Sequence, residues 1–281
     1  MSKVAIVTDS TAYIPPELVE QYKIHVAPLE LIWGDETFRD GVDIQPKEFY
    51  TRLKTATIMP TTSQVTIPYF QELFTDLIGK DFSVLCILIS EKLSGTVNSA
   101  VQARKILPES PIEIVDSYST SMALGFIVMT AAKAATQNAS LKECKELAEQ
   151  ARRHTDVVFA VDTLDFLHRG GRIGGASRFL GTALNIKPIL QVADGQVEAV
   201  EKVRTRSKSL SRLVELVEER SSGKRPLRIA VVHANAEADA RDLLEQTKKL
   251  HAEEYVLSQV SPVIGTHAGP GTVGIAFMAG M

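Results

Sequence analysis

The sequence is poor in the residues that carry metal or disulfide chemistry. Only two of its 281 residues are cysteines. Cys86 lies in an apolar run and Cys144 in a helical stretch, so the pair forms neither a metal-binding spacing nor a disulfide framework. The six histidines include no pair with the H-x-x-x-H spacing of a metal site. We therefore expect no metal and no cofactor, and the low cysteine content is typical of the reducing cytoplasm.

Strong net charge and long apolar runs are also missing. The net charge of −3 argues against nucleic acid or an anionic membrane as the main partner. The longest apolar run, residues 122–135, is interrupted by Gly125, Thr130 and Lys133, so it is too broken to span a bilayer. Residues 1–3 lead directly into a strand, so we expect no signal peptide. Together these features predict a soluble, cytoplasmic bacterial protein, which we expect to be a monomer.

The motifs of self-sufficient enzymes are absent as well. The only Gly-Lys pair, Gly223-Lys224, is followed by Arg225 and lacks the upstream glycine of a phosphate-binding loop. No G-x-S-x-G nucleophile elbow occurs. Residues 269–274 match G-x-G-x-x-G, but only seven residues follow, too few for the helix and second strand of a dinucleotide-binding unit. The sequence therefore identifies no catalytic residue.

Strands and helices alternate along the first half of the chain. Short β-branched runs predict strands, and 3.6-residue apolar spacing predicts the helices between them. This order predicts a parallel sheet with helices on both faces and a functional edge at the carboxyl ends of its strands. The predicted strands are Val4–Val7, Val26–Trp33, Ser83–Ile89 and Ile112–Val115, and the main predicted helices are 46–54, 68–78, 97–106, 119–135 and 141–154.

The pattern changes after Asp156. A strand over 157–161 is followed by two strands that pair around the tight-turn signal Asp194-Gly195. Further predicted elements are the strands 186–192, 196–203, 227–233 and 255–259 and the helices 207–220 and 237–250. We therefore predict a two-domain α/β protein, with a parallel α/β domain over 1–155 and a mixed α/β domain over 156–281.

Four hydroxyl-rich segments recur in the first domain. They are Thr8–Thr11, Thr61–Gln64, Ser90–Thr96 and Asp116–Ser121, and at least three follow a strand. Loops after parallel strands gather at one sheet edge, and a loop that enters a helix offers unpaired N–H groups to an anion. Each loop alone is equally explained by helix capping. Together they favour a polar pocket with little formal charge.

Two other features admit a functional and a structural explanation. His267 is flanked by Gly265, Gly269 and Gly271, where the backbone can approach a ligand, although a histidine can also stabilise its own turn. Basic residues are frequent between Arg169 and Lys208. They are explained by a solvated face, or by docking of an acidic or phosphate-bearing partner.

As an ordered set, these segments resemble the DegV family over essentially the whole chain. Proteins of this family are two-domain α/β lipid binders that hold one long-chain fatty acid, and several serve as the fatty-acid-binding subunit of a bacterial fatty acid kinase. The matching segments are Val7–Thr11, Thr61–Gln64, Ser94–Ala100, Ser121–Gly125, Leu167–Ile173, Asn185–Pro188 and Ser261–Gly271.

The resemblance implies roles for individual residues. Thr62 and Ser94 are expected to bind the fatty acid carboxylate, and His267 completes the head-group site. Thr61 and Gly95 are expected beside it. In the family, a separate ATP-dependent kinase subunit phosphorylates the bound acid, and the acyl phosphate feeds phospholipid synthesis. Arg172 and Arg206 resemble positions that serve kinase docking.

The acyl tail is expected to supply most of the affinity. Burying a methylene is worth ~0.8 kcal/mol, so roughly fifteen contribute about 12 kcal/mol before the cost of association. Apolar residues available for a tunnel are also candidates for ordinary core; they are Phe126, Ile127, Met129, Phe159, Phe166, Phe179, Leu180 and Leu184.

Two alternatives remain open from the sequence. The family fold resembles the substrate-binding half of dihydroxyacetone kinases, in which a histidine attaches a small ketone, so a phosphotransfer enzyme with His267 in that role is the first. The second is a lipid-responsive regulatory module without a kinase.

Overall fold

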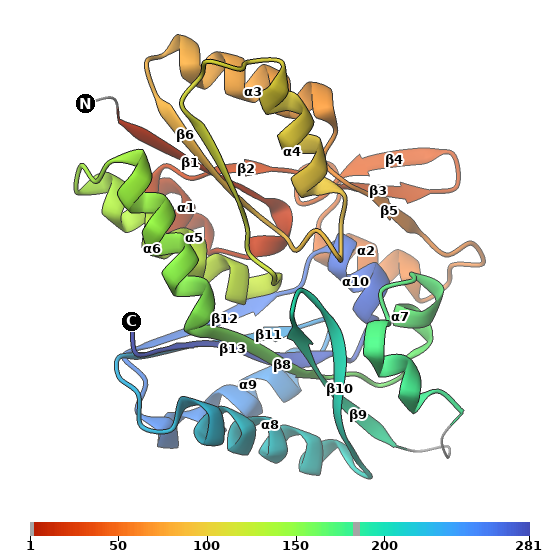
Figure 1. Cartoon of the computed structure of the whole chain (residues 1–281). Coiled ribbons are helices and arrows are strands. Elements are labelled where there is room, and N and C mark those ends of the chain that lie inside the picture. Colours follow the sequence, from red (N-terminus) through yellow and green to blue (C-terminus); the bar gives the residue numbers. More distant parts are fainter. Residues whose placement is uncertain (1–2, 182–185) are drawn as a thin grey trace.

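The computed structural model describes residues 3–181 and 186–281, and its strands form three sheets (Figure 1). Leu184 and Asn185, both named above from the sequence, lie outside the described residues. Within the described residues, no helix is both long and apolar enough to cross a membrane. The predicted fold class is confirmed, because one sheet is wholly parallel and another is mixed.

The parallel sheet has the strand order β2-β1-β6-β7. Every residue of β1 and β6 is buried, as expected for strands covered by helices on both faces. Val7 and Cys86 face one helical layer, whereas Ile6 and Ile87 face the other. The strands are β1 (Val4–Asp9), β2 (His25–Ala27), β6 (Ser83–Leu88) and β7 (Ile112–Asp116), and the covering helices are α3 (Ile67–Gly79), α4 (Thr96–Lys105), α5 (Ser121–Thr136) and α6 (Leu141–Arg153).

The mixed sheet has the order β10-β9-β8-β13-β11-β12, and only β11 and β12 pair in parallel. Figure 1 shows two helices, α8 and α9, on the side of this sheet that faces away from the parallel sheet. Its strands are β8 (Thr155–Ala160), β9 (Lys187–Ala193), β10 (Gln196–Val203), β11 (Leu227–His233), β12 (Glu254–Gln259) and β13 (Val273–Ala279), and its helices are α8 (Arg206–Ser221) and α9 (Glu237–Thr247).

A third, antiparallel sheet corrects two expectations. The single strand expected over Val26–Trp33 is two strands in different sheets, because Pro28 cannot donate a ladder hydrogen bond and the chain changes sheets there. The segment Thr61–Gln64, expected as a loop, supplies the edge strand β5. This sheet consists of β3 (Glu30–Trp33), β4 (Glu36–Arg39) and β5 (Thr61–Ser63), and the remaining helices are α1 (Pro16–Tyr22), α2 (Pro46–Leu53), α7 (Asp165–Arg169) and α10 (Pro262–Ala268).

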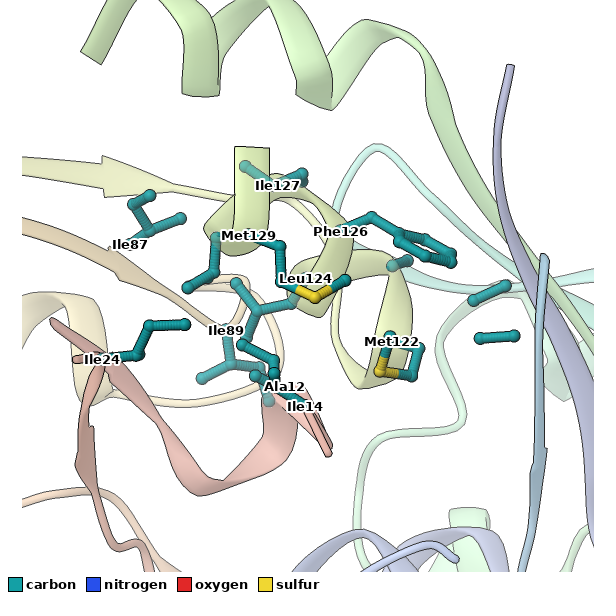
Figure 2. Close-up of a cluster of buried hydrophobic side chains, with 14 of the residues drawn as sticks. Ala12, Ile14, Ile24, Ile87, Ile89, Met122, Leu124, Phe126, Ile127 and Met129 are labelled. Carbon is teal, nitrogen blue, oxygen red and sulfur yellow. The ribbon is translucent and has the colours of Figure 1, made fainter. Parts of the chain in front are cut away.

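Helix α5 lies between the parallel and the mixed sheet and contacts β1, β6, β8 and β13. Its first half is apolar and buried on all sides from Met122 to Met129, whereas Lys133 and Thr136 near its end are exposed. In Figure 2 its side chains Met122, Leu124 and Met129 point toward Ile14 and Ile89 of the first domain. Phe126, Ile127 and Met129, which the sequence left as candidates for tunnel or core, are buried in the same hydrophobic cluster as Ile14 and Ile89.

A buried carboxylate also joins the two halves of the chain. Asp40 accepts hydrogen bonds of 2.7 Å from the Ser10 hydroxyl and 2.7 Å from the Ser261 hydroxyl, and a longer one from the Val263 amide. The titratable groups near Asp40 are the carboxyl of Asp9 and the phenols of Tyr13 and Tyr50. Because burial outweighs these hydrogen bonds, the pKa of Asp40 rises to about 6.

We expect Asp40→Asn to change how stability depends on pH. A carboxyl whose pKa is raised by folding stabilises the protein below its unfolded value of 3.8, and this contribution disappears as pH rises through about 6. When the pH is lowered from ~7.5 to ~5, the free energy of unfolding of the wild type should therefore increase by about 1.4 kcal/mol more than that of the variant. Denaturant titrations at both pH values measure this.

Asp43→Asn is the matched control. Asp43 is exposed, and its hydrogen bonds from Arg39 lower the pKa of its carboxyl to about 2. It stays ionised throughout the range, so its replacement should shift stability equally at both pH values. A wild-type to Asp40→Asn difference that does not vary with pH contradicts the raised pKa.

Candidate functional site

A single cavity combines an apolar wall with a small set of hydroxyl, imidazole and guanidinium groups. It encloses about 880 Å³ of space, part of it open to solvent, and lies between the parallel-sheet half and the mixed sheet. Its wall takes residues from β5, the loops after β6 and β7, β8, α10 and the β9–β10 hairpin. The apolar part of the wall includes Leu29, Ile89, Val157, Phe159, Val232 and Val260.

Thr62 and His267 meet at this cavity from opposite ends of the chain. The Thr62 hydroxyl lies 2.7 Å from the Nε2 atom of His267. Thr62 is the middle residue of β5 and pairs with Leu31, so strand alternation directs its side chain opposite to that of Thr61. His267 lies on the short helix α10, whereas the sequence placed it in a glycine loop.

The environment of His267 determines which atom carries its proton. Burial, and secondarily the positive charge of Arg172, lower the pKa of the imidazole to about 4, so the ring is neutral near pH 7. Its buried Nδ1 atom has no hydrogen-bond partner among the described residues and packs against Gly170. An unpaired lone pair is tolerated better than an unpaired N–H, which favours the proton on Nε2. Nε2–H then donates to Thr62, and the Thr62 hydroxyl is free to donate to a ligand.

Ser94 also lines the cavity, in the loop that leads into α4. Its hydroxyl lies 2.9 Å from that of Thr96 and accepts the Thr96 amide, although the N-cap residue of α4 is Gly95 and not Ser94. Gly95 does not line the cavity, but an added Cβ there would lie 3.3 Å from the Gln64 side chain. This close approach brings the Ser94 loop beside the end of β5.

The loops that follow three parallel strands converge, as the topology predicts. Asp9 accepts the Ile89 amide at 2.7 Å, and the Ser90 amide donates to the carbonyl of Ser119 at 2.9 Å. The second half of the chain then closes over the Ser90 loop, because the Ser90 hydroxyl donates to the Gly195 carbonyl in the β9–β10 turn. Contacts from both domains therefore hold the Ser90 loop in place.

Arg172 makes a second contact between the second half of the chain and the loop before α4. Its Nε donates to the Leu93 carbonyl at 3.0 Å and its Nη1 to the Gly170 carbonyl at 2.8 Å, and the side chain lines the cavity. Among the described residues of the wall it is the only one that carries a full charge at pH 7. A carboxylate bound at this end of the cavity therefore finds one cation and several neutral donors.

The remaining predicted residues lie elsewhere. Thr61 is exposed on β5. Arg206 is at the start of α8, where it donates to Asp239 at 2.9 Å and to the Gly271 carbonyl at 2.6 Å, away from the cavity wall. Of the apolar residues proposed for a tunnel, Phe159 lines the cavity, whereas the described wall does not include Phe126, Ile127, Met129, Phe166, Phe179 or Leu180.

Five polar residues of the wall were not given a role from the sequence, namely Ser63, Gln64, Thr120, Ser121 and Thr272. Thr120 and Ser121 line the cavity at the start of α5, and the hydroxyl of each is buried without a hydrogen-bond partner. The segment Asp116–Ser121 was recognised as hydroxyl-rich, but its spacing alone does not show which hydroxyls face inward. In residues 3–181 and 186–281, no group of three His, Cys, Asp or Glu side chains is suited to hold a metal ion.

Comparison with known proteins matches this chain along its length. A model described as "Uncharacterised protein, DegV family" matches residues 3–280. Protein DegV of Bacillus subtilis is 39% identical over 278 residues, which cover 98% of each chain. A protein of Thermus thermophilus, described by the words "Fatty Acid Binding of a DegV family Protein", superimposes with a TM-score of 0.94 at 32% identity over 99% of each chain. The structure of the Bacillus subtilis DegV, called a fatty acid binding protein, gives 0.89 at 36% identity over 99% of this chain and 100% of that one. This chain therefore belongs to the DegV family.

Proposed function

We propose that this protein binds one long-chain fatty acid, with the tail in the cavity and the carboxylate at Thr62 and Ser94, where His267 orients the Thr62 hydroxyl. The observation that carries the proposal is the composition of the cavity wall, which is mostly apolar and brings Thr62, His267 and Arg172 close together. An apolar wall gives affinity to a tail, and a few placed donors give it direction. The fatty acids bound by the relatives named above support the same ligand class.

We further propose that the bound acid is presented to a separate ATP-dependent fatty acid kinase, which forms the acyl phosphate for phospholipid synthesis. Arg172 lies at the polar end of the cavity and Arg206 at the start of α8, and both are assigned to docking of that kinase. The protein itself supplies no phosphotransfer chemistry in this scheme. It holds the carboxylate and excludes water from the tail.

The alternative of a dihydroxyacetone-kinase-like enzyme is less well supported. That chemistry requires an imidazole nitrogen free to attack a carbonyl carbon, but Nε2 of His267 is hydrogen-bonded to Thr62 and Nδ1 is packed against Gly170. A small polar ketone also gains little from an apolar wall. Mass spectrometry of a solvent extract of the purified protein separates the two proposals: a long-chain acid is expected, and a sugar phosphate overturns the fatty acid proposal.

Thr62→Val should lower the affinity for a long-chain fatty acid about tenfold or more. Valine has nearly the shape of threonine but removes a donor to the carboxylate, and a hydrogen bond to a charged group is worth roughly 1.5–3 kcal/mol. Thr61→Val is the matched control on the same strand, because Thr61 is exposed and does not line the cavity. Titration of delipidated protein with a fluorescent fatty acid measures both, and equal affinities in the two variants contradict the head-group assignment.

Arg172→Ala should release the fatty acid about tenfold faster. The change removes the hydrogen bond to the Leu93 carbonyl that joins two distant segments of the wall, and it removes the only charge on the described wall. Stopped-flow transfer of the acid to albumin measures the rate. Arg169→Ala, an exposed change in the same segment, should have no effect, and an unaltered release rate for Arg172→Ala argues against its closing role.

A further inference from the structure

Helix α5 begins without the side-chain cap that three other described helices have, and α10, with Ser261 at its N-cap, also begins without one. The N-cap residues Thr66, Ser140 and Thr205 each accept the amide of the residue three positions later, which is the usual capping arrangement. Thr120 occupies the same position of α5, but its hydroxyl makes no such bond. The first amide groups of a helix have no partner within the helix, so this end keeps unused donors.

The hydroxyls at this point are costly to leave unpaired. Thr120 is 8% exposed and Ser121 is 6% exposed, and neither hydroxyl has a hydrogen-bond partner among the described residues. An unpaired buried hydroxyl costs about 1–3 kcal/mol. Both residues line the cavity, where their neighbours include the apolar side chains of Ile89 and Val157. A polar group inside the cavity can recover this free energy, and a methylene cannot.

This pair is separate from the head-group site. Thr62 is bonded to His267, and Ser94 to Thr96, so no hydrogen bond in the described structure links either site to Thr120 or Ser121. The two sites also come from different elements, because the head-group site uses β5, α10 and the loop before α4, whereas the pair begins α5. The pair therefore adds two unpaired hydroxyls to a wall that is mostly apolar and that also contains Ser63, Gln64 and Thr272.

We propose that Thr120 and Ser121 form a second polar subsite that recognises an oxygen atom carried on the acyl chain, as in a hydroxy or oxo fatty acid. This inference rests on the proposed fatty acid binding and adds a substrate class to it. A neutral oxygen suits the site because both unpaired groups are neutral hydroxyls, and the first amide groups of α5 favour a hydrogen-bond acceptor. A site built to bond a substrate oxygen discriminates against the analogue without it, because its own polar groups are then unpaired.

The test is a competition within one protein. Delipidated full-length protein is incubated with equal amounts of octadecanoic acid and a hydroxy- or oxo-octadecanoic acid, using a series of isomers substituted at successive mid-chain carbons. Mass spectrometry of the retained acids gives their ratio. Wild type should favour at least one isomer about tenfold, and the double variant Thr120→Val/Ser121→Ala should reduce that ratio to about one. Partial unfolding lowers both acids together, so it does not change the ratio.

Two further variants sharpen the result. Thr120→Ser keeps a hydroxyl and should retain the preference. Thr62→Val should weaken both acids and leave their ratio unchanged, because the carboxylate is common to them. The proposal is overturned if wild type favours no isomer, as expected when water satisfies the pair, or if the preference survives the double change. Retention of no fatty acid of any kind by wild type instead overturns the proposed function itself.

Discussion

The packing of α5 between two sheets is the constraint on which the rest of the structure depends. A helical segment buried on every side must be apolar around its whole circumference, and this holds for α5 from Met122 to Met129. This helix lies between the two sheets and contacts both of them, and its first turn lines the cavity. The cavity therefore depends on how α5 holds the two sheets apart. Thr120 and Ser121, at the start of this helix, form part of the cavity wall.

Polar contacts across the domains then fix the wall in place. Asp40 holds the segment that begins α10, and α10 carries His267 to Thr62. Arg172 and the Ser90–Gly195 contact close the opposite side over the loop before α4. Thr62, His267 and Arg172 are each held by a partner from a distant segment, whereas Ser94 is held by Thr96 of its own loop.

Much of the fold could be predicted from the sequence because it rests on local signals. The buried strand Ser83–Leu88 is a continuous apolar run after its first residue, and α6 begins with the capping box of Ser140 and Glu143. The prediction was wrong where a tertiary pairing decided the outcome. The divided strand around Pro28 and the short strand β5 both depend on a partner strand that lies far along the chain.

The sequence by itself determined the α/β class, the order of most elements and the enrichment of hydroxyls after the parallel strands. These follow from the period of apolar residues and from the turn-forming residues that interrupt it, which act over a few positions. Only the tertiary structure decided that Thr62 faces the cavity and Thr61 does not, that His267 pairs with Thr62, and that Thr120 caps nothing. Whether a hydroxyl is satisfied or available depends on which distant groups reach it, and that is set by the packing of the two domains.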